Sequence, residues 1–198
     1  MFSYDEVSKR QTAKERIAYC TQELPFIGAG SGRKVYSLSL VDNLVIKVAK
    51  NSKGVLQNTT EVALYAHRPM DVYAQVLYAG RDYAWIVSQK CATVDAKVFK
   101  QYAGAGFHAF CRCLNYARAL ESRESLSEEA AEEFQRVTGD HKNTYFDKFW
   151  SAVSQKGLQG SVVMETPRLI DTHRLSSWGL TMEETPRLVL VDYGSLVS

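Results

Sequence analysis

The chain has 198 residues, of which 45% are hydrophobic and 23% are charged. This length and composition fit a folded protein with one domain or two small lobes, and they exclude a disordered chain. The 24 basic and 22 acidic residues leave a net charge of only +2 and are mixed along the chain, so the charge pattern does not support nucleic-acid binding.

The amino-terminal segment is predicted to be helical. Residues 4 to 23 mix apolar and charged side chains in the pattern of an amphipathic helix. Ser3 and Asp5 are suitable caps for its start, and Pro25 lies just beyond its end. We therefore expect one helix over residues 1 to 23 that packs on the segment that follows.

A glycine-rich segment comes next, with Gly28, Gly30 and Gly32 at alternate positions before the apolar run that begins at Val35. Because glycine has no Cβ atom, the backbone here can bend sharply and bring its N–H groups close to an anion. The segment therefore fits a cover over nucleotide phosphates. An ordinary hairpin turn would fit the same residues.

Two strands are predicted after the glycines, over residues 35 to 41 and 43 to 49, and the short polar turn between them favours antiparallel pairing. The second strand carries one charged residue, Lys47, within an apolar run. A buried ammonium group is rarely left without an acidic partner. We therefore expect such a partner on an element that packs over this strand.

Residues 53 to 65 form that predicted element, a helix with Glu61 near its middle. We predict an ion pair between Lys47 and Glu61, which would hold a fixed cation beside the glycine-rich hairpin. The apolar face of this helix is expected to consist of Val55, Leu56, Thr59, Val62 and Ala63.

Two further strands are predicted over residues 74 to 79 and 83 to 88, which completes a small α+β lobe over residues 24 to 92. The rest of the chain, residues 93 to 198, is predicted to be mainly helical. Its predicted helices cover residues 96 to 102, 107 to 122, 127 to 138 and 143 to 155, with Ser127 as a cap. The aromatic residues of the fourth helix are expected to form core: Tyr145, Phe146, Phe149 and Trp150.

Near the end of the chain, Asp171 begins a polar segment that leads to Trp178, and a predicted strand over residues 187 to 191 runs directly into Asp192, Tyr193 and Gly194. A carboxylate at the end of a buried strand, followed by glycine, is a common way to hold a divalent cation at a cleft. The same Asp-x-Gly pattern is also found in many turns.

The four cysteines form no C-x-x-C pair, and they are expected to be free thiols in a reducing compartment. The first residues lack the apolar core of a signal peptide, and no run of about 18 apolar residues occurs. We therefore expect a cytoplasmic protein without membrane association.

Taken together, these parts resemble the protein kinase-like superfamily, and most closely its small bacterial and bacteriophage members. The likeness rests on the segments RKVY, VIKVA, QN before the helix glutamate, and WG before DYG. It implies an antiparallel N-lobe with one inserted helix and a truncated, mainly helical C-lobe.

The resemblance also implies ATP and Mg²⁺ as cofactors, and a role for each matching residue. Gly28, Gly30 and Gly32 would cover the phosphates, and Lys47, oriented by Glu61, would hold them. Gln89 and Cys91 would lie in the hinge that binds adenine through backbone groups. Asp171 would accept the substrate proton, and Asp192 with Ser177 would bind the metal.

The sequence departs from the family pattern in three places. Gly32 stands one position early for G-x-G-x-x-G, and serines occupy positions 176 and 177, where a metal-binding asparagine is expected. Only four residues follow Gly194, so we expect no platform for a peptide substrate.

Three functions are compatible with the sequence. A pseudokinase-like protein would bind a partner protein, with a weak or vestigial ATP and Mg²⁺ site, and the phage resemblance implies a host protein as partner. An active ATP-dependent phosphotransferase would use Lys47, Glu61, Asp171 and Asp192. An unrelated α+β structural module would carry these residues incidentally.

Overall fold

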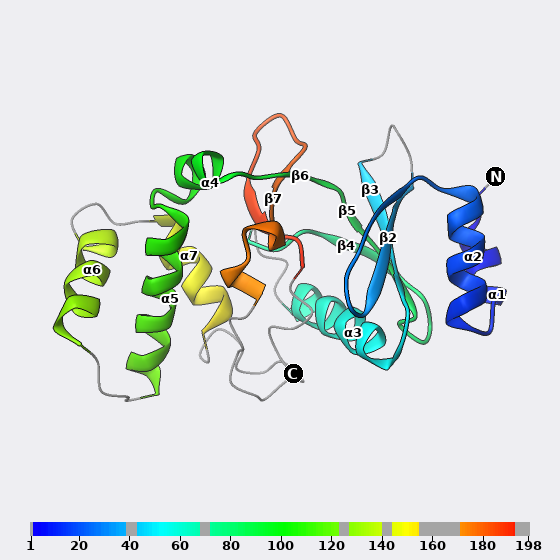
Figure 1. Cartoon of the computed structure of the whole chain (residues 1–198), viewed down its shortest axis with the longest axis horizontal. Coiled ribbons are helices and arrows are strands. Elements are labelled where there is room, and N and C mark those ends of the chain that lie inside the picture. Colours follow the sequence, from blue (N-terminus) through cyan, green and yellow to red (C-terminus); the bar gives the residue numbers. More distant parts are fainter. Residues whose placement is uncertain are drawn as a thin grey trace. The chain divides into compact units, whose positions relative to one another are not determined.

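The computed structural model describes residues 2–38, 43–67, 72–122, 127–139, 144–154 and 171–192. Within these residues the chain is a mixed α+β protein, as the sequence predicted, and it contains seven α-helices and a five-stranded antiparallel sheet (Figure 1). Tyr193 and Gly194 lie outside the described residues, and so does the side chain of Asp171.

The chain divides into two compact units. Unit 1 consists of residues 1–69 and 74–91, and unit 2 consists of residues 70–73 and 92–198. Each unit has its own sheet and its own helices.

Unit 1 is built on the five-stranded sheet, whose strands follow the order β1-β2-β3-β5-β4. All neighbouring strands are antiparallel. The helix α3 is inserted in the chain between β3 and β4. The strands are β1 Phe26–Ala29, β2 Arg33–Ser37, β3 Leu44–Ala49, β4 Val76–Ala79 and β5 Trp85–Gln89, and the helix is α3 Ser52–His67.

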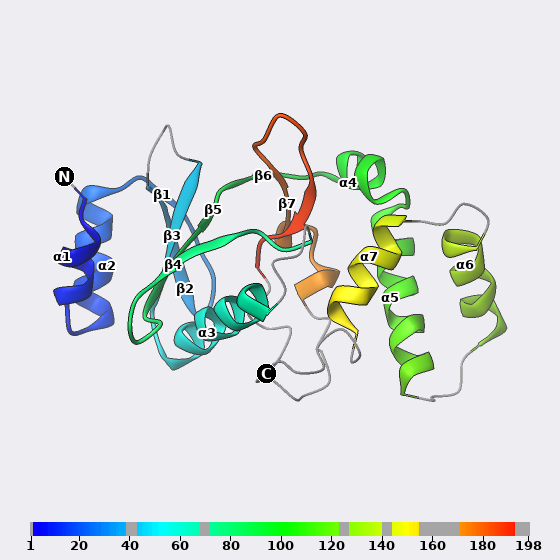
Figure 2. The ribbon, with the colours of Figure 1, turned by 180° about the vertical axis from the view of Figure 1, so that it is seen from behind.

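Alternation along β3 gives the sheet two different faces, because successive side chains of a strand point to opposite sides. Ile46 and Val48 belong to a hydrophobic cluster with Val7 and Cys20 from the amino-terminal helices. Lys47 lies between them in the strand and faces α3 instead. The amino-terminal helices and α3 therefore cover opposite faces of the sheet (Figures 1 and 2).

The prediction of one continuous amino-terminal helix was wrong. The segment forms two helices, α1 Tyr4–Lys9 and α2 Ala13–Glu23. Thr12 starts the second helix with a capping box, in which its side chain accepts from the Glu15 N–H and the Glu15 carboxylate accepts from the Thr12 N–H. Ser3 is the N-cap residue of α1 but makes no capping hydrogen bond through its side chain.

The described residues of unit 2 form four α-helices close to the predicted positions and a smaller sheet. The helices are α4 Ala96–Ala103, α5 Phe107–Glu121, α6 Glu128–Thr138 and α7 Thr144–Val153. The cap prediction is confirmed, since the Ser127 hydroxyl accepts from the Ala130 N–H. Three strands were only partly predicted: β6 Cys91–Thr93, β7 Trp178–Thr181 and β8 Leu188–Leu190, in the order β6-β7-β8.

The core of unit 2 is aromatic. Phe146 and Phe149 of α7 are buried, which confirms the core prediction for these two residues. The ring of Phe110 lies 5.4 Å from that of Phe146, and the ring of Trp178 lies 4.9 Å from that of Phe149. Aromatic pairs at these distances contribute beyond the burial of their area.

All four cysteines are free thiols, as the sequence predicted. Burial raises the pKa of Cys111 to about 12 and the pKa values of Cys20 and Cys113 to about 11. These three thiols are therefore protonated at neutral pH and are poor nucleophiles. In the part of the chain that the structure describes, no helix is long and apolar enough to cross a membrane.

Candidate functional site

The predicted ion pair of unit 1 is confirmed. The Nζ atom of Lys47 lies 2.7 Å from Oε2 of Glu61, and the Glu61 side chain is fully buried. The strand alternation turns Lys47 toward α3, and Glu61 stands in the middle of that helix. The structure therefore holds an ammonium group in one place on a rigid strand and helix.

A second cation at this site, Arg33, was not predicted from the sequence. The Arg33 guanidinium lies 2.8 Å from Oε1 of Glu61 and is also buried. Val35 pairs with Lys47 across β2 and β3, so Arg33, two residues earlier, lies on the same face of the sheet. The alternation of side chains along the strand, which puts Arg33 and Val35 on one face, is the sequence pattern that could have identified Arg33.

Two opposing effects act on the Glu61 carboxyl group. Burial alone would raise its pKa, because burial disfavours the charged form. Arg33 and, after it, Lys47 outweigh burial, and together they hold the pKa of Glu61 below its usual value of 4.5. The carboxylate is therefore ionised at neutral pH and binds both cations.

The predicted apolar face of α3 was wrong in detail. Leu56, which was assigned to that face, has 52% of its surface exposed. The face that packs inward contains Leu64 together with the polar residues Asn58 and Glu61. Because Glu61 must reach the two cations on the sheet, it fixes the rotation of the helix, and Leu56 is turned outward.

The glycine-rich segment is tied to the start of α3. The Gly30 N–H donates to the Arg33 carbonyl at 3.0 Å, and the Lys50 ammonium donates to the Gly30 carbonyl at 2.6 Å. A Cβ atom at Gly28 or Gly30 would meet no other atom within 4 Å, whereas one at Gly32 would overlap Gln57 and approach Gly54. Gly32 thus has a packing role that the sequence did not predict.

The contact between Gly32 and Gly54 leads to a testable expectation. Replacing Gly54 with alanine would ordinarily favour a helix by about 1 kcal/mol. Here the new Cβ atom would overlap the Gly32 carbonyl oxygen, so we expect a loss of about 1–3 kcal/mol instead. Thermal unfolding of Gly54→Ala checks this, with Gly28→Ala as the control in open space. A melting temperature at or above that of the wild type would contradict the prediction.

Of the two residues assigned to the hinge, Gln89 takes part in the backbone pairing of unit 1. Gln89 ends β5, and its N–H donates to the Gln75 carbonyl at 2.8 Å. The N–H of Lys90 donates to the Asn43 carbonyl at 2.6 Å. Cys91, the last residue of unit 1, is half-buried at the start of β6. An adenine contact at Gln89 or Cys91 stays a prediction.

The other residues assigned to catalysis and metal binding, Asp171, Ser177 and Asp192, lie in unit 2. Asp171 begins the short 3₁₀ helix η1 Asp171–His173, and Ser177 ends η2 Leu175–Ser177. The Val191 N–H donates to the Ser177 carbonyl at 2.7 Å. Asp192 is the next residue after Val191, so its backbone lies near Ser177. The fold therefore brings the two predicted metal ligands close together in space, although they are 15 positions apart.

Trp178 fixes this segment from the inside. Its indole Nε1–H donates to the Thr172 carbonyl at 3.0 Å, which joins η1 to the start of β7. Thr172 and Ser177 are both buried. The backbone between Asp171 and Ser177 is thus held against the aromatic core of unit 2.

The comparisons with known proteins give no family for this chain: no family model matches it, and no curated protein is similar to it in sequence.

Proposed function

We propose that this chain is a kinase-like protein that acts mainly by binding a partner protein and that keeps a nucleotide site of low affinity. The observation that carries the proposal is the buried pair of Lys47 and Glu61. Burial of two charges costs several kcal/mol per ion before their attraction is counted, so a buried ion pair is not explained by stability alone. A nucleotide phosphate provides a reason to keep the ammonium there.

The arrangement around the pair supports the same proposal. Five antiparallel strands, with one helix inserted after the lysine strand, agree with what the resemblance implies for an N-lobe. The glycine-rich turn between β1 and β2 is bonded to Lys50, just before α3 begins, and Gly32 packs against Gly54 in the first turn of that helix. Phosphate groups of ATP would be held between this turn and Lys47.

Three features favour low affinity over efficient catalysis. Glu61 is shared between Lys47 and Arg33, and the Gly30 N–H is already bonded within its own turn. Serines stand at positions 176 and 177, and a hydroxyl is a poorer fixed ligand for Mg²⁺ than an amide carbonyl. Each of these features weakens a contact that ATP or its metal would need.

A partner protein has exposed apolar surface available on unit 1. Phe26 and Ile27 of the edge strand β1, and Leu77 and Tyr78 of the other edge strand β4, are all exposed. Exposed large apolar side chains at sheet edges are typical of protein interaction sites. A host protein is the partner that the phage resemblance favours.

One observation favours the second candidate, an active phosphotransferase. The bond between Val191 and Ser177 brings Asp192 beside Ser177, in the same unit as Asp171. In this alternative, Asp192 and Ser177 would hold Mg²⁺ and Asp171 would accept the proton of the phosphoacceptor.

Calorimetric titration with ATP, with and without Mg²⁺, tests the proposal. We expect weak binding that Lys47→Met reduces at least about tenfold, or by about 1.4 kcal/mol, because the variant loses the cation proposed to hold the phosphates. The exposed Lys53→Met is the matched control and should bind as the wild type does.

The role of the metal decides between the two candidates. Binding that does not depend on Mg²⁺ and survives Asp192→Ala agrees with the low-affinity proposal. Binding that needs both, accompanied by phosphoryl transfer, would favour the active enzyme. Equal ATP affinity in Lys47→Met and in the wild type would contradict both candidates.

A further inference from the structure

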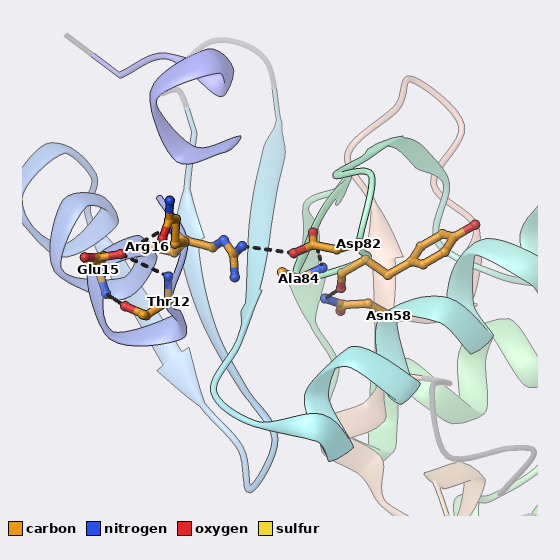
Figure 3. A network of polar contacts seen from close by, with 8 residues as sticks. Thr12, Glu15, Arg16, Asn58, Asp82 and Ala84 are labelled. Atoms are coloured by element: carbon orange, nitrogen blue, oxygen red, sulfur yellow. Dashed lines mark hydrogen bonds and ion pairs between the residues drawn. The ribbon is translucent and has the colours of Figure 1, made fainter. Parts of the chain in front are cut away.

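A continuous chain of polar contacts runs from the amino-terminal helix α2 to the buried pair of Lys47 and Glu61. It begins at Arg16, whose guanidinium donates to Oδ2 of Asp82 at 2.9 Å (Figure 3). Asp82 belongs to the turn between β4 and β5, 66 positions from Arg16 in the sequence. Its side chain is 56% exposed, so the chain of contacts starts at the surface.

The turn that carries Asp82 has an unusual backbone conformation. Tyr83 has φ of 54°, the left-handed region that residues other than glycine rarely adopt. Two contacts hold it there: the Tyr83 N–H donates to the Gly80 carbonyl at 3.0 Å, and Oδ1 of Asp82 accepts from the Ala84 N–H at 3.1 Å. The Tyr83 carbonyl is then available to α3.

Asn58 of α3 connects this turn to the ion pairs. Its Nδ2 donates to the Tyr83 carbonyl at 2.8 Å, and its Oδ1 accepts from Nη1 of Arg33 at 3.2 Å. The side chain is fully buried. Its amide has only one acceptable orientation, because a flipped amide would set NH₂ against the guanidinium and oxygen against the carbonyl.

Arg33 completes the chain of contacts. One of its nitrogens is bonded to Asn58, and another lies 2.8 Å from Oε1 of Glu61. The remaining carboxylate oxygen, Oε2, accepts from Lys47. The position of Asn58 therefore influences which oxygen of Glu61 is left for Lys47.

We propose that docking of α2, through Arg16 and Asp82, sets the geometry of Arg33, Glu61 and Lys47, with Asn58 as the positioning residue between them. A buried polar network of this kind responds as a whole, because a member that loses its partner leaves the next buried group unsatisfied. As far as it concerns nucleotide affinity, this inference rests on the function proposed above.

If α2 sets the geometry of the ion pairs, the contact between Arg16 and Asp82 can regulate the nucleotide site. A partner that binds over α2 and separates Arg16 from Asp82 would release the turn at Tyr83, then Asn58, and then Arg33. Arg33 would no longer be held in its present contact with Glu61, and Lys47 would shift with the carboxylate. A partner protein on α2 would thus alter the nucleotide site without touching it.

Nuclear magnetic resonance of the full chain tests the coupling without any nucleotide. We expect Arg16→Met to shift the side-chain amide signals of Asn58 and the guanidinium signals of Arg33, and to speed their exchange with solvent at least about fivefold, since such exchange follows local opening. Lys14→Met, an exposed change on the same helix, should leave these signals in place. Arg16→Lys should restore them in part.

A second variant separates the ion pair from the turn itself. Asp82→Asn keeps an oxygen for the Ala84 N–H but removes the charge that binds Arg16. We expect a smaller shift of the Asn58 signals than in Arg16→Met. Unchanged Asn58 and Arg33 signals in Arg16→Met, in a protein whose helical content is intact, would overturn the inference.

Titration of the same variants with ATP distinguishes the two proposals. If the wild type binds ATP, Arg16→Met should weaken binding at least about threefold. In binding free energy this is roughly half of the tenfold loss that we expect for Lys47→Met. An Arg16→Met protein with wild-type ATP affinity would overturn the regulatory part of the inference. If the wild type binds no ATP, the proposed nucleotide site fails, and the Asn58 signals still decide whether α2 is coupled to Arg33.

Discussion

Replacing Glu61 with glutamine is expected to destabilise unit 1 by about 3–5 kcal/mol, the cost of removing one partner from a buried ion pair. The substitution keeps the size of the side chain and removes its charge. Arg33 and Lys47 would then both be buried without the carboxylate that binds them. The cost of these unpaired cations, and not a cavity, is the reason for the large effect.

Urea unfolding followed by circular dichroism measures this loss, and hydrogen exchange of the β3 and α3 amides locates it. Glu6→Gln is a close control, because Glu6 also pairs with two cations, Lys9 and Arg10, but on the exposed surface of α1. Exposed pairs contribute little, so this variant should unfold as the wild type does. Equal stability of the two variants would contradict a stabilising role for the buried carboxylate.

The same variant should change how stability depends on pH. The pKa of Glu61 is lower in the folded chain than its usual value of 4.5, so its ionised form stabilises the fold fully above that pH. This contribution begins to be lost as the pH falls below 4.5, the pKa of Glu61 in the unfolded chain, and it is gone once the pH is below the pKa of Glu61 in the folded chain. Wild-type stability should therefore fall in acid, and the difference from Glu61→Gln should shrink. A constant difference from pH 7 down to pH 3 would contradict this.

Replacing Trp178 with alanine is expected to destabilise unit 2 by about 3–5 kcal/mol, the usual cost of removing a large aromatic side chain from a core. Trp178 is almost fully buried, and its ring lies about 5–6 Å from those of Phe99, Phe110 and Phe149. The substitution would also leave the Thr172 carbonyl without its indole donor. The segment between η1 and β7 would lose its internal support.

Circular dichroism during urea unfolding measures the effect, since it does not depend on tryptophan fluorescence. Trp150→Ala is the matched control at a half-buried position of α7 and should cost clearly less. Trp178→Phe should lie between the two, because it keeps the aromatic contacts and loses the hydrogen bond. Similar losses for Trp178→Ala and Trp150→Ala would show that Trp178 is not the centre of this core.

The sequence by itself determined most of the local elements and one long-range contact. Strand and helix periods located β3, α3 and the helices of unit 2, and a charged residue within an apolar strand led to the pair of Lys47 and Glu61. This was possible because a buried charge must find a partner, and few elements could supply one. The free thiols and the aromatic core of α7 followed from composition and spacing in the same way.

Other features were decided only by the tertiary structure. The break between α1 and α2 depends on the capping box at Thr12, which starts a new helix there. The amphipathic pattern of the sequence continues across this position and gives no sign of the break. The inward face of α3 is set by the two cations that Glu61 must reach, so apolar spacing alone assigned Leu56 to the wrong side.

The most informative contacts join residues that no local pattern connects. Arg33 reaches Glu61 because the register of β2 against β3 sets it on the face of Lys47, and Asn58 reaches Tyr83 because the turn after β4 adopts a left-handed conformation. Gly32 and Gly54 meet only when α3 is docked on its sheet. Sequence periodicity fixes which side of an element a residue occupies, whereas the partner on that side depends on how the elements pack.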